Sequence, residues 1–241
     1  DLLPLIHHAS EDKTCKGFII KLGSFSSSLS SVSMIQEIRS ELEKAKLEGK
    51  KIYVYIEQWA SLPEYYLASV ADKIVMPELG TISHLGIELE VRKTKSFLNN
   101  FGITQEIIAT GIYKDSLVPE SDKLSEMERT VLEDLVGDLY HQVLFDIKRS
   151  RKLDWDVVSD VFDGRLIAAS EAKEKGLVDE LGFWDDLNAM VEDIDQKSIT
   201  VAELPEFYMG EDQPFLINPF NRIAIVEIDG QIHMGQNSTN F

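Results

Sequence analysis

Residues 50–77 decide the fold, and they read KKIYVYIEQWASLPEYYLASVADKIVMP. The first part is rich in β-branched and aromatic side chains and predicts a buried strand over 50–56. Pro63 suits the first turn of a helix, and the apolar residues after it predict a short helix over 63–71. Residues 73–76 predict another strand. A strand, a helix and a strand in this order favour a parallel pairing of the two strands.

The same alternation continues on both sides of this stretch. Residues 17–22 (GFIIKL) predict a strand, and apolar side chains at three- and four-residue spacing then predict a helix that ends at Gly49. Residues 80–86 are expected to form a loop. Further helices are predicted at residues 2–9, 93–100, 125–151, 154–161, 168–175 and 183–194, and further strands at residues 105–109 and 222–228. The pattern predicts an α/β fold with a mainly parallel sheet and an additional helical region.

The charge balance excludes one class of partner. The chain has 241 residues, and 24 basic against 42 acidic side chains give a formal charge of −18. Because so acidic a chain repels phosphate backbones, we expect no nucleic-acid partner. The single cysteine, Cys15, leaves no internal disulfide framework. No apolar run reaches the roughly 20 residues that span a bilayer.

Both ends of the sequence read as interrupted units. Residues 2–9 predict the last turns of a helix that no strand precedes, and residues 222–228 predict a strand that opens a new unit. We therefore expect this sequence to be a segment of a longer protein.

Metal and phosphate chemistry lack a supporting pattern. The five histidines are scattered, and the adjacent His7 and His8 would point about 100° apart on a helix. The sequence contains no G-x-G-x-x-G and no phosphate-binding loop. We expect neither a metal site nor a cofactor site.

Serine and lysine side chains are the remaining candidates for catalysis. Ser24, Ser26 and Ser61 follow predicted strands, although no G-x-S-x-G surrounds them. Lys114 follows a predicted strand and Gly111. A lysine can take the proton of a serine hydroxyl only if its surroundings lower its pKa by several units from about 10.4. Position alone leaves two alternatives open. Lys114 could be an ordinary surface lysine, and the three serines could be ordinary loop residues at the ends of strands.

Three segments resemble the signal peptide peptidase A family. Residues 111–119, GIYKDSLVP, resemble the G-x-Y-K-S-A-x-E-P stretch in the amino-terminal half of its long, two-repeat form. Residues 64–74, EYYLASVADKI, are similar to the family's Y-Y-L-A-S-x-A-D-K-I segment. Residues 162–182, FDGRLIAASEAKEKGLVDELG, resemble its closing pattern, which contains G-R and G-L-V-D. In chain order the three segments are residues 64–74, 111–119 and 162–182, so the resemblance extends over much of residues 15–190.

The resemblance implies a fold and a division of the chain. The family has a crotonase/ClpP-like fold of repeated strand–strand–helix units with a mainly parallel sheet. Residues 1–202 would be the amino-terminal repeat, truncated at its start. Residues 203–220 would be a linker, and residues 221–241 would be the first strand of a second repeat that is otherwise missing.

The resemblance also implies that the two repeats share the catalytic work. Lys114 would be the general base, and the missing repeat would supply the nucleophilic serine. When the Tyr-Tyr pairs of the two repeats are aligned, Leu62 stands at the nucleophile position and Ser61 is one residue away. Asp115 replaces the family's usual serine, and its carboxylate would favour a protonated lysine unless it points away. Ser24 and Phe25 stand where the catalytic repeat has a glycine pair for its oxyanion hole.

The implied protein is a serine endopeptidase that degrades cleaved signal peptides or other hydrophobic peptides without a cofactor. The resemblance implies a homo-oligomer and a membrane anchor outside this segment. It places the protein on the extracytoplasmic (periplasmic) side of the membrane in a bacterium, or at the thylakoid in a plastid. The segment alone is expected to be inactive.

Two alternatives remain open. One is a non-catalytic scaffold repeat in which Lys114 is structural. The other is an acyl-CoA-binding, crotonase-like enzyme, which the acidic charge and the Ser24-Phe25 pair disfavour.

Overall fold

The computed structural model describes residues 2–25, 29–104, 106, 108, 110–111, 122–195, 200–203 and 222–230. These residues fall into two compact units. One unit comprises residues 1–85 and 145–241, and the other comprises residues 86–144. Among the described residues, no helix is both long and apolar enough to cross a membrane.

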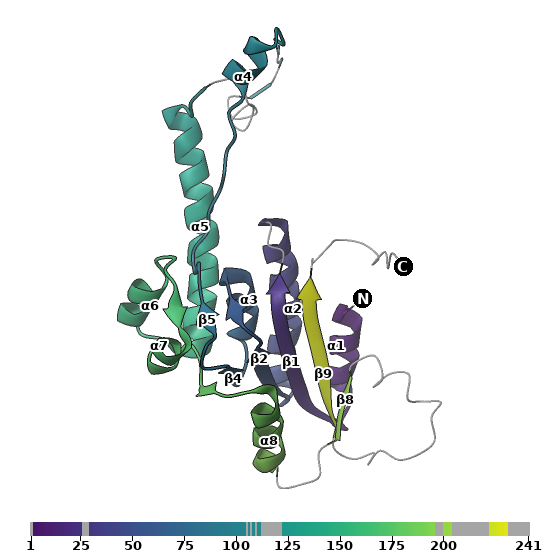
Figure 1. Ribbon diagram of the computed structural model, residues 1–241. Coiled ribbons are helices and arrows are strands. Elements are labelled where there is room, and N and C mark those ends of the chain that lie inside the picture. The colour runs from purple at the N-terminus through teal and green to yellow at the C-terminus, as the bar shows by residue number, and fades with distance from the viewer. Residues whose placement is uncertain are drawn as a thin grey trace. The chain divides into compact units, whose positions relative to one another are not determined.

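The larger unit is built on a parallel sheet (Figure 1). Its strands are β1 (Cys15–Phe25), β2 (Lys51–Ile56), β4 (Lys73–Met76), β7 (Glu180–Leu181), β8 (Thr200–Glu203) and β9 (Arg222–Gly230). They lie in the order β7-β4-β2-β1-β9-β8, and every neighbouring pair is parallel. The α/β class and the mainly parallel sheet predicted from the sequence are confirmed.

A second, smaller sheet contains β3 (Trp59–Ala60), β5 (Thr81–Ile82) and β6 (Ile167–Ala168). Strand β3 pairs with β5 in parallel, and β5 pairs with β6 antiparallel. Strand β5 lies within residues 80–86, so the prediction of a plain loop is wrong there. Strand β2 of the larger sheet, β3 of the smaller sheet and the helix after them form a strand–strand–helix unit, as expected for a crotonase/ClpP-like fold.

The helices begin and end within a few residues of their predicted bounds. The larger unit contains α1 (Leu2–Glu11), α2 (Leu29–Leu47), α3 (Leu62–Ala68), α6 (Trp155–Val161), α7 (Ala169–Glu174) and α8 (Trp184–Asp195). Helix α4 (Lys95–Asn100) lies in the smaller unit, and α5 (Glu126–Arg151) runs from the smaller unit into the larger.

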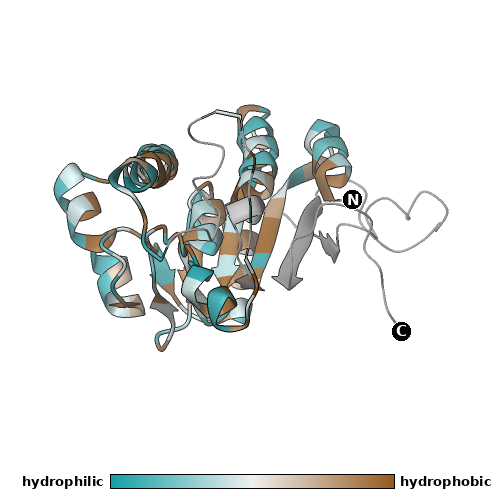
Figure 2. Ribbon diagram, turned by 90° about the horizontal axis from the view of Figure 1, so that it is seen from above, coloured by the Kyte–Doolittle hydropathy of each residue, from teal (hydrophilic) through white to brown (hydrophobic). Residues whose placement is uncertain are grey.

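The core of the larger unit lies on both faces of the sheet, with helices on both sides (Figure 2). Alternate strand residues, including Ile19, Tyr53 and Val75, pack with Leu187 and Val191 of α8 on one face. Because successive side chains in a strand point to opposite faces, their neighbours face the other side. These neighbours are also buried, and they include Ile20, Ile52, Val54 and Ile74, all 0% exposed. Burial of each such side chain contributes about 1.5–3 kcal/mol.

The smaller unit has polar contacts at the start of α5. Ser125 and Glu128 form a capping box, in which the Ser125 amide donates to Glu128 at 2.6 Å and the Glu128 amide donates to Ser125 Oγ at 3.2 Å. Lys93 pairs with Glu128 at 2.8 Å. The strand predicted over residues 105–109 lies mostly outside the described residues.

Strand β9 lies between β1 and β8 in the larger sheet. Its Ile223 is paired with Gly17 of β1 and with Val201 of β8. The division into a repeat (1–202), a linker (203–220) and the first strand of a second repeat (221–241) stays a prediction.

Candidate active site

The carboxyl ends of β1 and β2 meet at one edge of the larger sheet. The two strands are parallel, with Leu22 beside Ile56, and the Glu57 amide donates a 3.1 Å hydrogen bond to the Leu22 carbonyl. In open parallel sheets, ligands bind outside the carboxyl ends of the strands. The candidate Ser24 lies near the carboxyl end of β1 itself, and the candidate Ser61 lies in the segment that follows β2 and β3.

Ser61 immediately precedes α3 and has an extended backbone, with φ −92° and ψ −173°. Its amide donates a 3.0 Å hydrogen bond to Oε2 of Glu64, and its hydroxyl donates to the same oxygen. A serine followed three residues later by a glutamate is the capping-box pattern of a helix start. The Ser61 hydroxyl is therefore directed toward a carboxylate.

The carboxylate of Glu64 is buried at this edge of the sheet. The Glu64 side chain is 0% exposed, and its Oε1 accepts a 2.6 Å hydrogen bond from the Phe25 amide at the end of β1. Burying an ionised carboxylate is costly unless hydrogen bonds compensate it, and these donors supply that compensation. Glu64 was not among the residues predicted above, although its spacing from Ser61 is a signal that the sequence carries.

The structure describes some of the other predicted site residues and not others. Leu62, aligned with the nucleophile position, is the first residue of α3 and is only 5% exposed. Ser24 lies in β1, where only its backbone is described, and Ser26 lies outside the described residues. Lys114 and Asp115 also lie outside them. The pairing of Lys114 with a serine therefore stays a prediction.

Tyr65 and Tyr66, from the second family-like segment, connect α3 to distant parts of the chain. The Tyr65 hydroxyl donates a 2.9 Å hydrogen bond to the Leu177 carbonyl, and the Tyr66 hydroxyl donates one of 2.9 Å to Asp146 Oδ2. Burial raises the pKa of both hydroxyls, so both remain protonated donors. Their contacts are structural.

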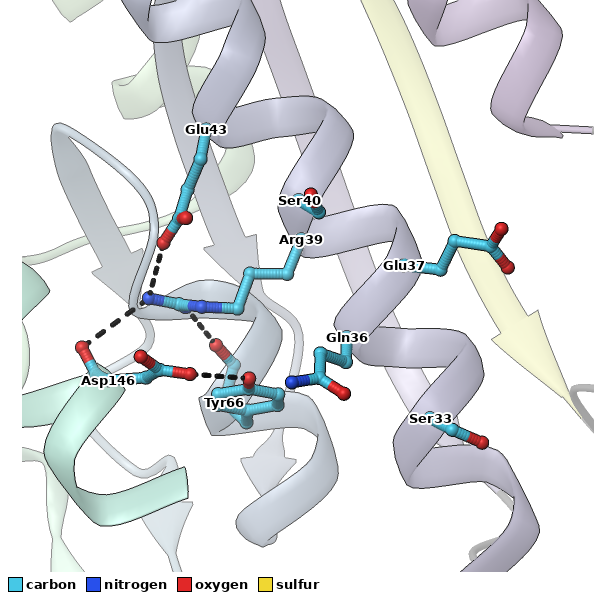
Figure 3. A pocket seen from close by; sticks show the side chains of 8 residues that line it. All are labelled: Ser33, Gln36, Glu37, Arg39, Ser40, Glu43, Tyr66 and Asp146. Carbon is cyan, nitrogen blue, oxygen red and sulfur yellow. Dashed lines mark hydrogen bonds and ion pairs between the residues drawn. The ribbon is translucent and has the colours of Figure 1, made fainter. Parts of the chain in front are cut away.

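Arg39 of α2 is the centre of a second polar cluster (Figure 3). It is 2% exposed, and its guanidinium donates to the Tyr66 carbonyl at 2.6 Å and to Ser69 Oγ at 2.7 Å. It also donates to Ser150 Oγ at 2.5 Å and pairs with Glu43 at 3.2 Å. Burial lowers the pKa of Arg39, and the negative charge of Glu43 opposes that shift. Arg39 was not predicted, although it falls on the apolar face of its helix.

A pocket of about 380 Å³ opens beside this cluster. Its lining includes Gln36, Arg39, Glu43, Tyr66 and Asp146, and several of these groups bond to one another (Figure 3). Among the described residues that line it, hydroxyls and carboxylates occur but no lysine does. The pocket therefore lacks the groups for serine–lysine chemistry.

The closing family-like segment also forms structural contacts. Asp179 accepts a 2.7 Å hydrogen bond from the Ile74 amide of β4 and one of 2.9 Å from Arg151. Arg165 pairs with Glu171 at 2.9 Å. The bonds to Asp179 hold β4 and the end of α5 against the segment at residues 176–179.

His7 and His8 are adjacent on α1, and their ring centroids are 5.9 Å apart. His7 lies 3.7 Å from a carboxylate oxygen of Glu11 and 3.6 Å from one of Glu41. In the part of the chain that the structure describes, no group of three or more His, Cys, Asp or Glu side chains could hold a metal ion. No described residue is assigned to a metal or a cofactor.

Comparison with known proteins gives the following matches. Residues 44–198 match the family model of Peptidase family S49. The chain is 27% identical over 208 residues to a protein of Enterococcus faecium that is named after signal peptide peptidase SppA. It is 24% identical over 250 residues to Protease 4 of Haemophilus influenzae. A solved peptidase from Plasmodium falciparum is 16% identical, with a TM-score of 0.47 over 76% of this chain and 86% of that chain.

The curated relatives are longer than this chain. The Enterococcus match covers 86% of this chain and 58% of the relative, and the Haemophilus match covers 98% of this chain and 40% of the relative. The chain thus spans between two fifths and three fifths of these two proteins.

Proposed function

Because the chain belongs to peptidase family S49, we propose that it is the lysine-bearing half of a serine–lysine endopeptidase. The family agrees with the resemblance seen in the sequence. The observation that carries the proposal is the family match over residues 44–198, which includes the segment GIYKDSLVP with Lys114. The nucleophilic serine would come from a second repeat outside this chain.

In the proposed reaction, the serine hydroxyl of the second repeat attacks the carbonyl carbon of a peptide bond. Neutral Lys114 accepts the hydroxyl proton, and backbone amides stabilise the oxyanion. Lys114 then donates this proton to the leaving amine, which leaves an acyl-serine. A water molecule attacks the acyl-serine, Lys114 takes its proton, and the proton returns to the serine oxygen as the acid product leaves. No cofactor takes part.

The contacts of Ser61 support a nucleophile that lies in the second repeat and not at this strand edge. Leu62 has no nucleophilic atom, and the Ser61 hydroxyl donates to Glu64. A nucleophilic serine needs a base that can take its proton and free donors for the oxyanion. Residues 1–241 alone are therefore expected to be inactive as a peptidase.

The substrates in this proposal are cleaved signal peptides or other hydrophobic peptides. The working protein is a homo-oligomer that a segment outside this chain anchors to a membrane. Its peptidase domain lies on the extracytoplasmic side in a bacterium or at the thylakoid in a plastid. These statements follow from the family resemblance.

Substitution of Lys114 in the full-length protein tests the assignment. Lys114→Ala should lower kcat for a hydrophobic peptide at least about 100-fold, the usual contribution of a general base. Lys95→Ala, which removes an exposed lysine of α4, should leave kcat unchanged. Circular dichroism of both variants checks that the fold is retained.

Two results would contradict the proposal. One is wild-type turnover by folded Lys114→Ala protein. The other is peptide hydrolysis by residues 1–241 alone that Ser61→Ala abolishes, because this would place the nucleophile in the first repeat.

A further inference from the structure

Three hydrogen-bond donors converge on the Glu64 carboxylate. The Phe25 amide donates to Oε1 at 2.6 Å, and the Ser61 amide and hydroxyl both donate to Oε2, the amide at 3.0 Å. Phe25 and Glu64 are 39 residues apart, so the donors come from two separate segments, the end of β1 and the residue before α3. All three groups point at one buried negative charge.

Hydrolases bind a developing oxyanion with comparable donors, although their donors meet on one oxygen, whereas the donors to Glu64 are divided between Oε1 and Oε2 of one carboxylate. Backbone amides from two separate segments point at one oxygen that becomes negatively charged in the transition state. Here the negative charge belongs to a side chain of the protein itself. The residue at position 63 reduces the number of available donors further, because Pro63 has no amide hydrogen.

We propose that Glu64 permanently occupies an oxyanion-type site at the carboxyl edge of the sheet and thereby closes it. A carboxylate accepts stronger hydrogen bonds than a neutral peptide carbonyl, by about a factor of two. Because Glu64 is part of the chain, it also avoids the entropic cost that an incoming ligand has to meet. A neutral substrate carbonyl therefore does not displace it.

The occupied site also determines the role of Ser61. Its hydroxyl and its amide contact the same carboxylate oxygen, which is 0% exposed as part of the Glu64 side chain. Attack by this hydroxyl on a carbonyl would need the very donors that Glu64 holds. Ser61 is accordingly a residue that begins α3 and not a nucleophile.

This inference goes beyond the proposed function, because it concerns Ser61 and Glu64 and not Lys114. It would stand even if Lys114→Ala retained full activity. Conversely, loss of activity in Lys114→Ala would not decide the role of Glu64, which needs a separate experiment.

Hydrogen exchange in the full-length protein provides that test. Mass spectrometry of peptides that cover residues 15–25 reports the Phe25 amide. In Glu64→Ala this amide should exchange at least about tenfold faster than in wild type, because loss of a charge-assisted hydrogen bond costs that factor or more. Glu57→Gln is the matched control, since it changes a half-exposed carboxylate at the same edge, and it should exchange as wild type does.

Sodium formate distinguishes an occupied anion site from a general loss of packing. Formate should restore slow exchange of the Phe25 amide in Glu64→Ala, whereas sodium chloride at equal ionic strength should not. If Glu64→Ala does not fold, Glu64→Gln decides the question. Faster exchange than wild type in the glutamine variant supports the proposal.

Three results would overturn the inference. The first is wild-type exchange of the Phe25 amide in Glu64→Ala or, if only that variant folds, in Glu64→Gln. The second is a failure of formate to slow exchange in Glu64→Ala. The third is a fluorophosphonate adduct on Ser61 of the wild-type protein, found by peptide mapping, because it would show a reactive serine at an open site.

Discussion

The guanidinium of Arg39 lies over the ring of Tyr66, with its central carbon 4.8 Å from the ring centroid. The same group donates a 2.6 Å hydrogen bond to the Tyr66 carbonyl and one of 2.5 Å to Ser150 Oγ. Arg39 therefore joins α2 to α3 and to the last turns of α5. A buried charge with several partners of this kind is costly to remove, because each acceptor loses its donor.

Arg39→Met should lower the free energy of unfolding by about 3 kcal/mol, because it leaves buried oxygens without donors. Arg129→Met is the control, since Arg129 is 63% exposed and pairs only with Glu133 across one helix turn among the contacts described. Its effect should stay within about 0.5 kcal/mol. Urea unfolding of both variants measures the difference. Equal stability of the two would contradict the structural role of Arg39.

Two glycine-to-alanine substitutions should act in opposite directions. A Cβ atom at Gly17 would lie 2.2 Å from the Lys51 carbonyl oxygen, so β1 and β2 would have to move apart. We expect Gly17→Ala to cost about 3 kcal/mol or more. Gly137 lies in α5, and a Cβ atom added there would have nothing within 4 Å of it outside the backbone of its own helix. Gly137→Ala should therefore raise stability by about 0.5–1 kcal/mol. Thermal unfolding distinguishes the two outcomes.

The alkaline stability of the fold should depend on Tyr65. Burial raises the pKa of the Tyr65 hydroxyl, which donates to the Leu177 carbonyl. The unfolded chain therefore releases this proton first, near pH 10. The free energy of unfolding should then fall above about pH 10, by up to about 1.4 kcal/mol per pH unit for this group.

Tyr65→Phe should remove this part of the alkaline slope, and at pH 7 it should cost only about 1 kcal/mol for the lost hydrogen bond. Urea unfolding at pH 7, 9, 10 and 11 measures both effects. Tyr140→Phe makes the same chemical change on α5 and should retain the slope that Tyr65 supplies. An unchanged slope in Tyr65→Phe would refute the prediction.

The acid stability of residues 86–144 should depend on the Lys93–Glu128 pair. Lys93 first, and then the Ser125 amide, hold the pKa of Glu128 at about 2. Because this value is below that of an unfolded glutamate, about 4.3, the pair stabilises the folded state above that pH. The stabilisation should be lost as the pH falls from about 4.3 toward 2.

NMR titration of the Glu128 carboxyl carbon tests this expectation. Lys93→Met should raise its pKa toward the ordinary value. Arg92→Met should leave it unchanged, because Arg92 pairs with the neighbouring Glu90. A Glu128 pKa that does not respond to Lys93→Met would show that Lys93 is not the cause.

Elements with a periodic apolar pattern could be predicted from the sequence. Strand β4 has the predicted bounds, Lys73–Met76, and α5 begins one residue after the predicted cap Ser125. The strands β3, β5, β6 and β7, each of two residues, could not be predicted. A two-residue strand has no period, and its existence depends on distant partners, as in the pairing of Thr81 with Ala168.

At the candidate site, too, local patterns could be predicted from the sequence and contacts between distant residues could not. The sequence by itself determined the family, because the Tyr-Tyr, G-x-Y-K and closing segments are local patterns. That Leu62 stands at the nucleophile position stays a prediction from the resemblance. The sequence also marked Lys114 as the base, which stays a prediction. Only the tertiary structure decided what Ser61 and Glu64 do. The amide that binds Glu64 belongs to Phe25, 39 residues earlier, and only the folding of β1 beside α3 brings the donor and the carboxylate together.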